Sequence, residues 1–158
     1  GELSAPLYLS DFVVMRVATL FGVGGMSRTG TNFVETVLRK AAEGNEFPVV
    51  DDQTMSPTSA QDVAEFVLTV LRRGCDRGVY HVVNTGEVTR YGFAREILRQ
   101  AGMPVGIVRP CTSEEFPTAA RRPSYSALEN QKLRSVVADG MQSWKDTLAV
   151  YLRAREEP

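Results

Sequence analysis

The stretch FVVMRVATLF (residues 12–21), followed after a loop by NFVETVLRKAAE (residues 32–43), decides the fold class. The first segment is a nearly continuous apolar run rich in β-branched residues, which is typical of a strand buried on both faces. In the second segment, apolar residues recur at the 3.6-residue spacing of an amphipathic helix. A buried strand that leads through a loop into a helix indicates an α/β protein.

Short strands and helices alternate along the rest of the chain. Ser59 and Ser143 each stand three positions before an aspartate, a capping-box variant that marks a helix start, and Thr31 is the predicted cap of the helix at 32–43. The sequence predicts one α/β domain over residues 1–158, with a small, partly parallel sheet and flanking helices. The further predicted strands are residues 47–50, 79–83 and 105–108, and the further helices are one from Ser59 and those at 91–101, 126–133 and 143–155. The helix from Ser59 is predicted to bury Val63, Phe66, Val67, Val70 and Leu71.

Composition excludes several classes of partner. The formal net charge is −1, so no basic excess points to nucleic acid. No stretch of about 18 apolar residues exists, so we expect no membrane-spanning segment. Cys75 and Cys111 are far apart and no secretory signal precedes them, which indicates free thiols and a cytoplasmic location. With His81 as the single histidine, no metal site is expected.

The glycine-rich loop has the order of a dinucleotide-binding fingerprint. Gly22, Gly24 and Ser27 follow a predicted strand, and Asp51 ends the next one. In the fingerprint the helix opens within the motif, whereas here it begins near Asn32, five residues after Ser27. We therefore assign no cofactor-binding residue to this chain. The alternative is a nucleotide-binding fold that uses this loop.

The sequence contains no tyrosine–lysine pair at the spacing that suits acid/base chemistry. A tyrosine with a lysine four positions later would place both side chains on one helix face, where the ammonium lowers the phenol pKa. The five tyrosines are followed at that spacing by Phe, Asn, Arg, Glu and Arg. His81 is expected to be structural, and no catalytic residue is predicted.

Two polar clusters are candidate binding sites. Arg121 and Arg122, followed by Pro123, form an adjacent guanidinium pair that suits a diphosphate, or else lies in a solvated loop. The second cluster follows a predicted strand, where ligands of α/β sheets bind, and its alternative role is to cap the next helix. This cluster comprises Asp52, Gln53, Pro57 and Thr58.

Six segments, taken in order, form a pattern: RVATLFG from Arg16, GTNFVETVLRKAAEGNE from Gly30, VVDDQTMSPTSAQDVA from Val49, GVYHVVNTGEVTRYGFAREI from Gly78, EEFPTAARRPSYSAL from Glu114 and SWKDTLAVYL from Ser143. Together they resemble dTDP-4-dehydrorhamnose reductases. These are extended short-chain dehydrogenases that reduce a nucleotide-linked 4-keto sugar with a nicotinamide cofactor. The resemblance implies the C-terminal, substrate-binding part of a Rossmann-like fold. Thr19, Met55 and Tyr125 depart from the usual residues, which leaves the sugar open.

The resemblance also implies binding roles. Asn32 and Phe33 would line a nucleotide-sugar pocket, and Arg121 and Arg122 would approach the diphosphate. The sugar side would be shaped by Gln53, Pro57 and Thr58.

By the same resemblance, the cofactor fingerprint and the catalytic tyrosine and lysine would lie before residue 1. NADPH or NADH would serve the complete enzyme, while this chain alone would bind neither and would not be catalytic. Because an isolated half would expose the edge of strand 12–21, we expect a homo-oligomer or a partner that completes the fold. The alternative is a non-catalytic interaction or dimerisation module derived from such a reductase.

Overall fold

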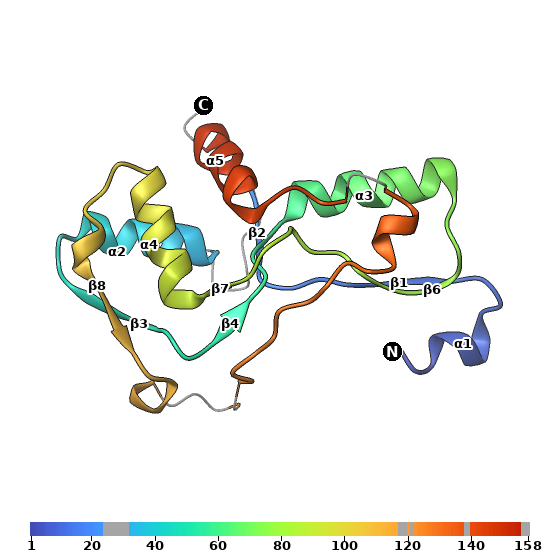
Figure 1. Cartoon of the computed structure of the whole chain (residues 1–158), viewed down its shortest axis with the longest axis horizontal. Helices are drawn as coiled ribbons and strands as arrows, with labels where there is room; N and C mark the ends of the chain where they lie inside the picture. The colour runs from blue at the N-terminus through green and yellow to red at the C-terminus, as the bar shows by residue number, and fades with distance from the viewer. Residues whose placement is uncertain (24–31, 117–119, 121, 138–139, 156–158) are drawn as a thin grey trace.

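The computed structural model is an α/β structure that describes residues 1–23, 32–116, 120, 122–137 and 140–155. Its elements fall into two groups along the long axis of the molecule (Figure 1). Each group contains a four-residue pair of parallel strands and its own cluster of buried apolar side chains, and a shorter parallel pair lies where the chain passes between the groups. The predicted α/β class with partly parallel pairing is therefore confirmed.

The first group contains β1 (Val13–Arg16), which pairs in parallel with β6 (Gly78–His81). Helix α3 (Ala60–Arg73) belongs to the same group, and its Phe66 shares a core with Tyr80 of β6. Leu71 of α3 was predicted to be buried, but it is 76% exposed. The reason is that the described sheet of this group has only two strands, which is too narrow to cover the helix face fully.

The predicted strand over residues 12–21 is wrong as one continuous element, because it divides into β1 and β2 (Leu20–Phe21). Thr19 lies between them with φ of 42°, a left-handed conformation that interrupts the strand. β2 then pairs in parallel with β5 (Thr58–Ser59). The chain thus passes from the first group of elements to the second at Thr19.

The second group contains β3 (Phe47–Val50) and β8 (Val108–Cys111), paired in parallel beside three helices. Its core joins Phe21 to Phe93 and Phe93 to Trp144 through ring contacts of 5.9 and 5.5 Å. The helices are α2 (Phe33–Ala42), α4 (Arg90–Gln100) and α5 (Trp144–Ala154). The remaining elements are α1 (Ala5–Tyr8), the antiparallel pair β4 (Thr54–Met55) and β7 (Val88–Thr89), and the 3₁₀ turns η1 (Val105–Ile107), η2 (Ser113–Glu115) and η3 (Leu133–Ser135).

Side-chain caps begin the four longer helices, α2 to α5. The Ser59 hydroxyl accepts a hydrogen bond from the backbone N–H of Asp62, as the capping pattern predicts. Thr31 lies outside the described residues, and the cap of α2 is Asn32, whose Oδ1 accepts from the N–H of Glu35 at 3.0 Å. Asn32 thus fixes the start of α2, and Phe33 is the first residue of that helix.

Two predicted elements are wrong. Residues 105–107 form a 3₁₀ turn and the strand follows at Val108–Cys111, three residues later than predicted. The predicted helix at 126–133 is an irregular segment that ends in η3. Its polar groups bind distant residues, since the Leu128 N–H donates to Ser56 Oγ and the Asn130 amide bonds both backbone groups of Val83.

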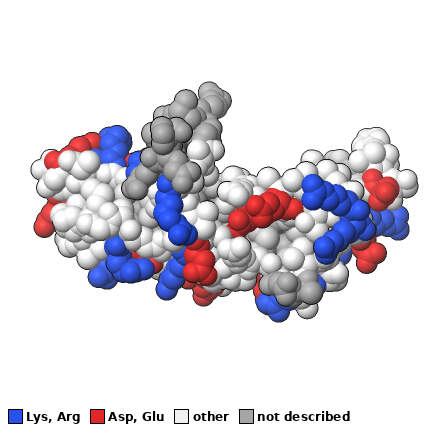
Figure 2. Space-filling view, turned by 90° about the horizontal axis from the view of Figure 1, so that it is seen from above, with Lys and Arg blue, Asp and Glu red and all other residues white. Residues whose placement is uncertain are grey.

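Surface charge is mixed. Figure 2 shows basic and acidic side chains interspersed over the visible face, in keeping with the net charge of −1. No helix in the described part of the chain is long and apolar enough to cross a membrane.

Candidate functional site

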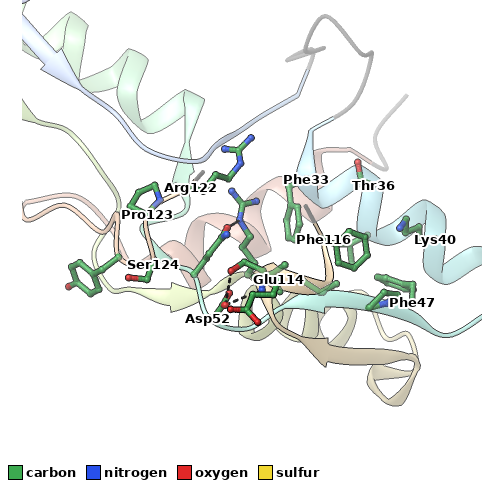
Figure 3. A pocket seen from close by; sticks show the side chains of 18 residues that line it. Phe33, Thr36, Lys40, Phe47, Asp52, Glu114, Phe116, Arg122, Pro123 and Ser124 are labelled. Carbon is green, nitrogen blue, oxygen red and sulfur yellow. Dashed lines mark hydrogen bonds between the residues drawn. The ribbon is translucent and has the colours of Figure 1, made fainter. Parts of the chain in front are cut away.

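A cavity of about 1140 Å³ opens beside α2 and β3 in the second group of elements (Figure 3). Its volume slightly exceeds the range of about 300–1,000 Å³ that is usual for small-molecule and cofactor sites. One wall is formed by residues 122–125, which run beside β4, where Tyr125 pairs with Thr54. The described lining residues are Phe33, Thr36, Val37, Lys40, Phe47, Pro48, Val49, Val50, Asp52, Gln53, Arg90, Ser113, Glu114, Phe116, Arg122, Pro123, Ser124 and Tyr125.

Aromatic rings gather at one end of the cavity. Figure 3 shows Phe33, Phe47 and Phe116 near one another beside α2, away from Pro123 and Ser124. The ring of Phe33 stacks on buried Phe93 at 5.7 Å with an interplanar angle of 13°. Because the core holds Phe33 in this way, the aromatic end is a preformed apolar surface.

Arg90 brings a positive charge to the same cavity. Its Nε donates a 3.1 Å hydrogen bond to Gln53 Oε1, and its guanidinium lies 5.9 Å from the ring centroid of Phe33. Burial, and then the nearby charge of Arg122, lower the pKa of Arg90. Neither Arg90 nor Arg122 forms an ion pair with a carboxylate of the described residues. The two cations are therefore available to an anion.

Acidic side chains lie on the opposite side of the cavity from Arg122 (Figure 3). Asp52 accepts hydrogen bonds from the Ser113 backbone at 3.0 Å and from its hydroxyl at 2.8 Å. The backbone bond first, and then the hydroxyl, lower the pKa of Asp52. This carboxylate thus ties η2 to the end of β3 and fixes the cavity wall.

The structure brings three of the predicted binding residues together. Phe33, Gln53 and Arg122 line the cavity. Arg121 lies outside the described residues, and its clamp role stays a prediction.

Asn32, Pro57 and Thr58 are not among the lining residues, and their binding roles also stay predictions. Thr58 is fully buried and its hydroxyl donates to the Ser56 carbonyl, while Asn32 caps α2 and also donates to Tyr151. In this structure their polar atoms support the elements around the cavity.

Sequence reasoning missed Arg90 as a site residue. The available signal was its place in the first turn of α4, directly after the cap Thr89. A helix N-terminus carries partial positive charge, so a cation there is electrostatically unfavourable unless something else requires it.

His81 has a structural environment. Arg16 Nη1 can only donate, so the 3.2 Å contact makes His81 Nε2 the acceptor, and Nδ1–H donates to the Glu129 carbonyl. Within the described residues, no group of three or more His, Cys, Asp or Glu is arranged to hold a metal ion.

The described part of the glycine loop makes packing contacts. A Cβ on Gly22 would lie 2.9 Å from the Cβ of Ala60, so this glycine permits close packing on α3. Asp51 is engaged by the Thr89 hydroxyl at 2.6 Å. Gly24 and Ser27 lie outside the described residues. A second cavity of about 370 Å³ beside Gly22 has no lysine or arginine among its described lining residues.

Comparison with known proteins places this fold in a family. The model of the RmlD substrate binding domain matches residues 1–156. The chain belongs to this family. The cavity and its cations therefore lie within an RmlD substrate binding domain.

Relatives and solved structures extend the comparison. This RmlD domain is 36% identical over 154 residues to a dTDP-4-dehydrorhamnose reductase of Mycobacterium tuberculosis, covering 98% of the chain and 49% of that protein. A reductase of the same name from Bacillus anthracis, solved in complex with NADP, shares 33% identity with a TM-score of 0.87 over 97% of this chain and 52% of that one. The reductase of Clostridium acetobutylicum shares 38% identity with a TM-score of 0.81 over 91% and 49%. The chain thus spans about half the length of these relatives, and its Rossmann-like, extended short-chain dehydrogenase fold is confirmed.

Proposed function

We propose that residues 1–158 act as a single domain, the nucleotide-sugar-binding part of an enzyme like dTDP-4-dehydrorhamnose reductase. The observation that carries this proposal is the cavity itself, which joins an aromatic end to two cations without described counter-ions. Apolar walls with a few convergent polar groups are the usual form of a ligand site. The names of the matched relatives supply the substrate class, a dTDP-linked sugar.

The arrangement of side chains gives the ligand a direction. A nucleobase would lie at the aromatic end, against Phe47 and Phe116, because flat apolar rings stack on one another. The diphosphate would lie toward Arg122, whose planar guanidinium makes paired hydrogen bonds to phosphate oxygens. The sugar would then extend toward Ser124 and Tyr125.

Reduction needs groups that these residues do not supply. None of the five tyrosines has a lysine four positions later, and we expect the loop after Gly22 to bind no dinucleotide. In the complete family enzyme, NADPH or NADH supplies the hydride. We assign to this chain the binding and orientation of the nucleotide sugar, and we expect no turnover by residues 1–158 alone.

A second candidate function is association through β1. Among the described residues β1 pairs only with β6, so one edge of this two-stranded sheet is open. Val17 and Leu20, which follow β1, are 38% and 46% exposed. Open edges and exposed apolar residues favour pairing with another chain. We infer a homo-oligomer or a partner that completes the fold.

The test is a thermal-shift screen of the purified chain with dTDP, a dTDP-linked sugar and NADPH. A ligand that binds only the native state raises the unfolding midpoint. We expect dTDP and the dTDP-sugar to raise it and NADPH to leave it unchanged, with Arg122→Ala reducing the dTDP shift. A shift with NADPH and none with dTDP would overturn the proposal in favour of the loop at Gly22.

A further inference from the structure

The side chains of Arg90 and Gln53 are hydrogen-bonded to each other in the cavity, and the proposed function gives this pair no role. We propose that Arg90 makes this cavity selective for two adjacent phosphates over one, and that Gln53 positions Arg90 instead of contacting the sugar. This inference rests on the proposed function, since it names the ligand group that the cations of the same cavity take.

Two hydrogen bonds fix Arg90 relative to Gln53. The Nε of Arg90 donates to Gln53 Oε1 at 3.1 Å, and the backbone N–H of Arg90 donates to the Gln53 carbonyl at 3.2 Å. A guanidinium has five N–H donors in a fixed fork, so this side-chain bond leaves the four donors of the terminal nitrogens for a ligand. The side-chain oxygen of Gln53 thus accepts a hydrogen bond that orients the Arg90 guanidinium.

The ring of Phe33 provides the second support. The Arg90 guanidinium lies 5.9 Å from the centroid of this ring, within the range of a cation–π contact. Phe33 is itself stacked on buried Phe93. The guanidinium is therefore restrained by a ring contact with Phe33 and by a hydrogen bond to Gln53, which is preorganisation of the kind that favours binding.

Charge accounts for the preference for two phosphates. Arg90 and Arg122 line one cavity and are close enough for the charge of Arg122 to disfavour protonation of Arg90. No described carboxylate pairs with either. The repulsion between these two cations is reduced most by an anion that contacts both guanidinium groups. A diphosphate presents a charged group to each guanidinium, whereas a monophosphate presents one.

A competing explanation is that Arg90 only packs on Phe33 and takes no part in binding. Affinity for matched nucleotides separates the two explanations. We suggest isothermal titration of the full chain with dTDP and with dTMP, for the wild type and for Arg90→Met, which keeps an unbranched apolar side chain over the ring. Arg95→Met is the control, because Arg95 is an exposed arginine of the same helix that stacks on Tyr91.

We expect Arg90→Met to weaken dTDP binding about tenfold or more, the usual effect of losing hydrogen bonds to a charged group. The loss for dTMP should be less than about threefold, and Arg95→Met should change neither. Equal losses for both nucleotides, or no loss, would overturn the inference while leaving the proposed function intact. Failure of the wild type to bind dTDP at all would overturn both.

Gln53→Ala tests the positioning role. If Gln53 orients Arg90, this variant weakens dTDP and a dTDP-linked sugar by the same factor. If Gln53 contacts the sugar, the dTDP-sugar loses affinity and dTDP does not, which would contradict the assignment. Gln53→Glu adds a second readout, since a carboxylate would keep Arg90 in place but cancel its charge. We expect Gln53→Glu to leave the unfolding midpoint unlowered and to weaken dTDP about tenfold.

Discussion

The hydroxyl of Tyr151 in α5 donates a 2.6 Å hydrogen bond to Oε1 of Glu35 in α2. The same hydroxyl accepts from the Asn32 side chain at 3.0 Å, and Arg155 donates twice to Glu35 at 2.9 Å. These contacts join the end of the chain to the first turn of α2. Because Phe33 begins α2 and lines the cavity, the network holds one wall of the candidate site in place.

Tyr151→Phe removes this hydroxyl and keeps the ring in the core. Two hydrogen bonds are lost, one of them to a carboxylate, so we expect the free energy of unfolding to fall by about 1–3 kcal/mol. Urea denaturation monitored by circular dichroism measures the change. Tyr8→Phe is the matched control, since Tyr8 is 84% exposed and should change stability by less than about 0.5 kcal/mol. Equal effects of the two substitutions would show that the network contributes nothing.

Glu35 gives the stability of the protein a dependence on acid pH. Burial opposes ionisation of this carboxyl, but the hydrogen bonds from Arg155 and Tyr151 outweigh burial, so the pKa of Glu35 is lowered by folding. A lowered pKa contributes stability that is present above the unfolded value, about 4.3, and is lost as pH falls through the folded value. Glu35→Gln should therefore lose stability at neutral pH and flatten the decline below about pH 4.3. An unchanged acid slope in urea titrations across this range would contradict the assignment.

Gly22 tests the role of the loop after β2. A Cβ at this position would lie 2.9 Å from the Cβ of Ala60, so Gly22→Ala should destabilise the protein by about 1–3 kcal/mol through overpacking. Gly106→Ala is the control, because a Cβ there meets nothing within 4 Å. Thermal unfolding compares the two variants. A neutral Gly22→Ala that also altered NADPH binding would instead support a cofactor role for the loop.

The open edge of β1 predicts association. Sedimentation velocity over a range of concentrations should show self-association of the isolated chain, and Val17→Lys should weaken it, since a charge beside an edge strand opposes pairing. Leu71→Lys serves as comparison, because Leu71 is an exposed apolar residue of α3. A chain that is monomeric at all concentrations would contradict the prediction. If only Leu71→Lys weakened association, the contact would belong to α3.

Strong local signals predicted much of the fold. The strand at 47–50 matches β3, and the helices from Ser59, at 91–101 and at 143–155 match α3, α4 and α5 to within one or two residues. A cap residue and a 3.6-residue apolar period are properties of neighbouring positions, so they can be recognised without the rest of the molecule.

Elements that depend on distant partners could not be predicted in this way. The segment at 126–133 has a helical pattern, yet Asn130 bonds the N–H and carbonyl of Val83, 47 residues away. Thr19 interrupts the strand at 12–21 because its carbonyl accepts from Thr58, another distant contact. In both cases long-range hydrogen bonds prevail over local preference.

The candidate site also has residues that local sequence signals predict and residues that depend on distant contacts. The adjacent arginines before Pro123 point to an anion site, and Arg122 does line the cavity. Arg90 acquires its role only when folding brings Gln53 and Phe33 beside it, and those residues are 37 and 57 positions away in the sequence. The position of an arginine in the first turn of a helix was the one local sign.

A crystal structure of this chain soaked with dTDP tests the central claim most directly. We expect thymine at the aromatic end of the cavity, against Phe47 and Phe116, with the diphosphate between Arg90 and Arg122. Density for dTDP in the smaller cavity between α3 and α5, or a diphosphate that contacts neither arginine, would contradict it.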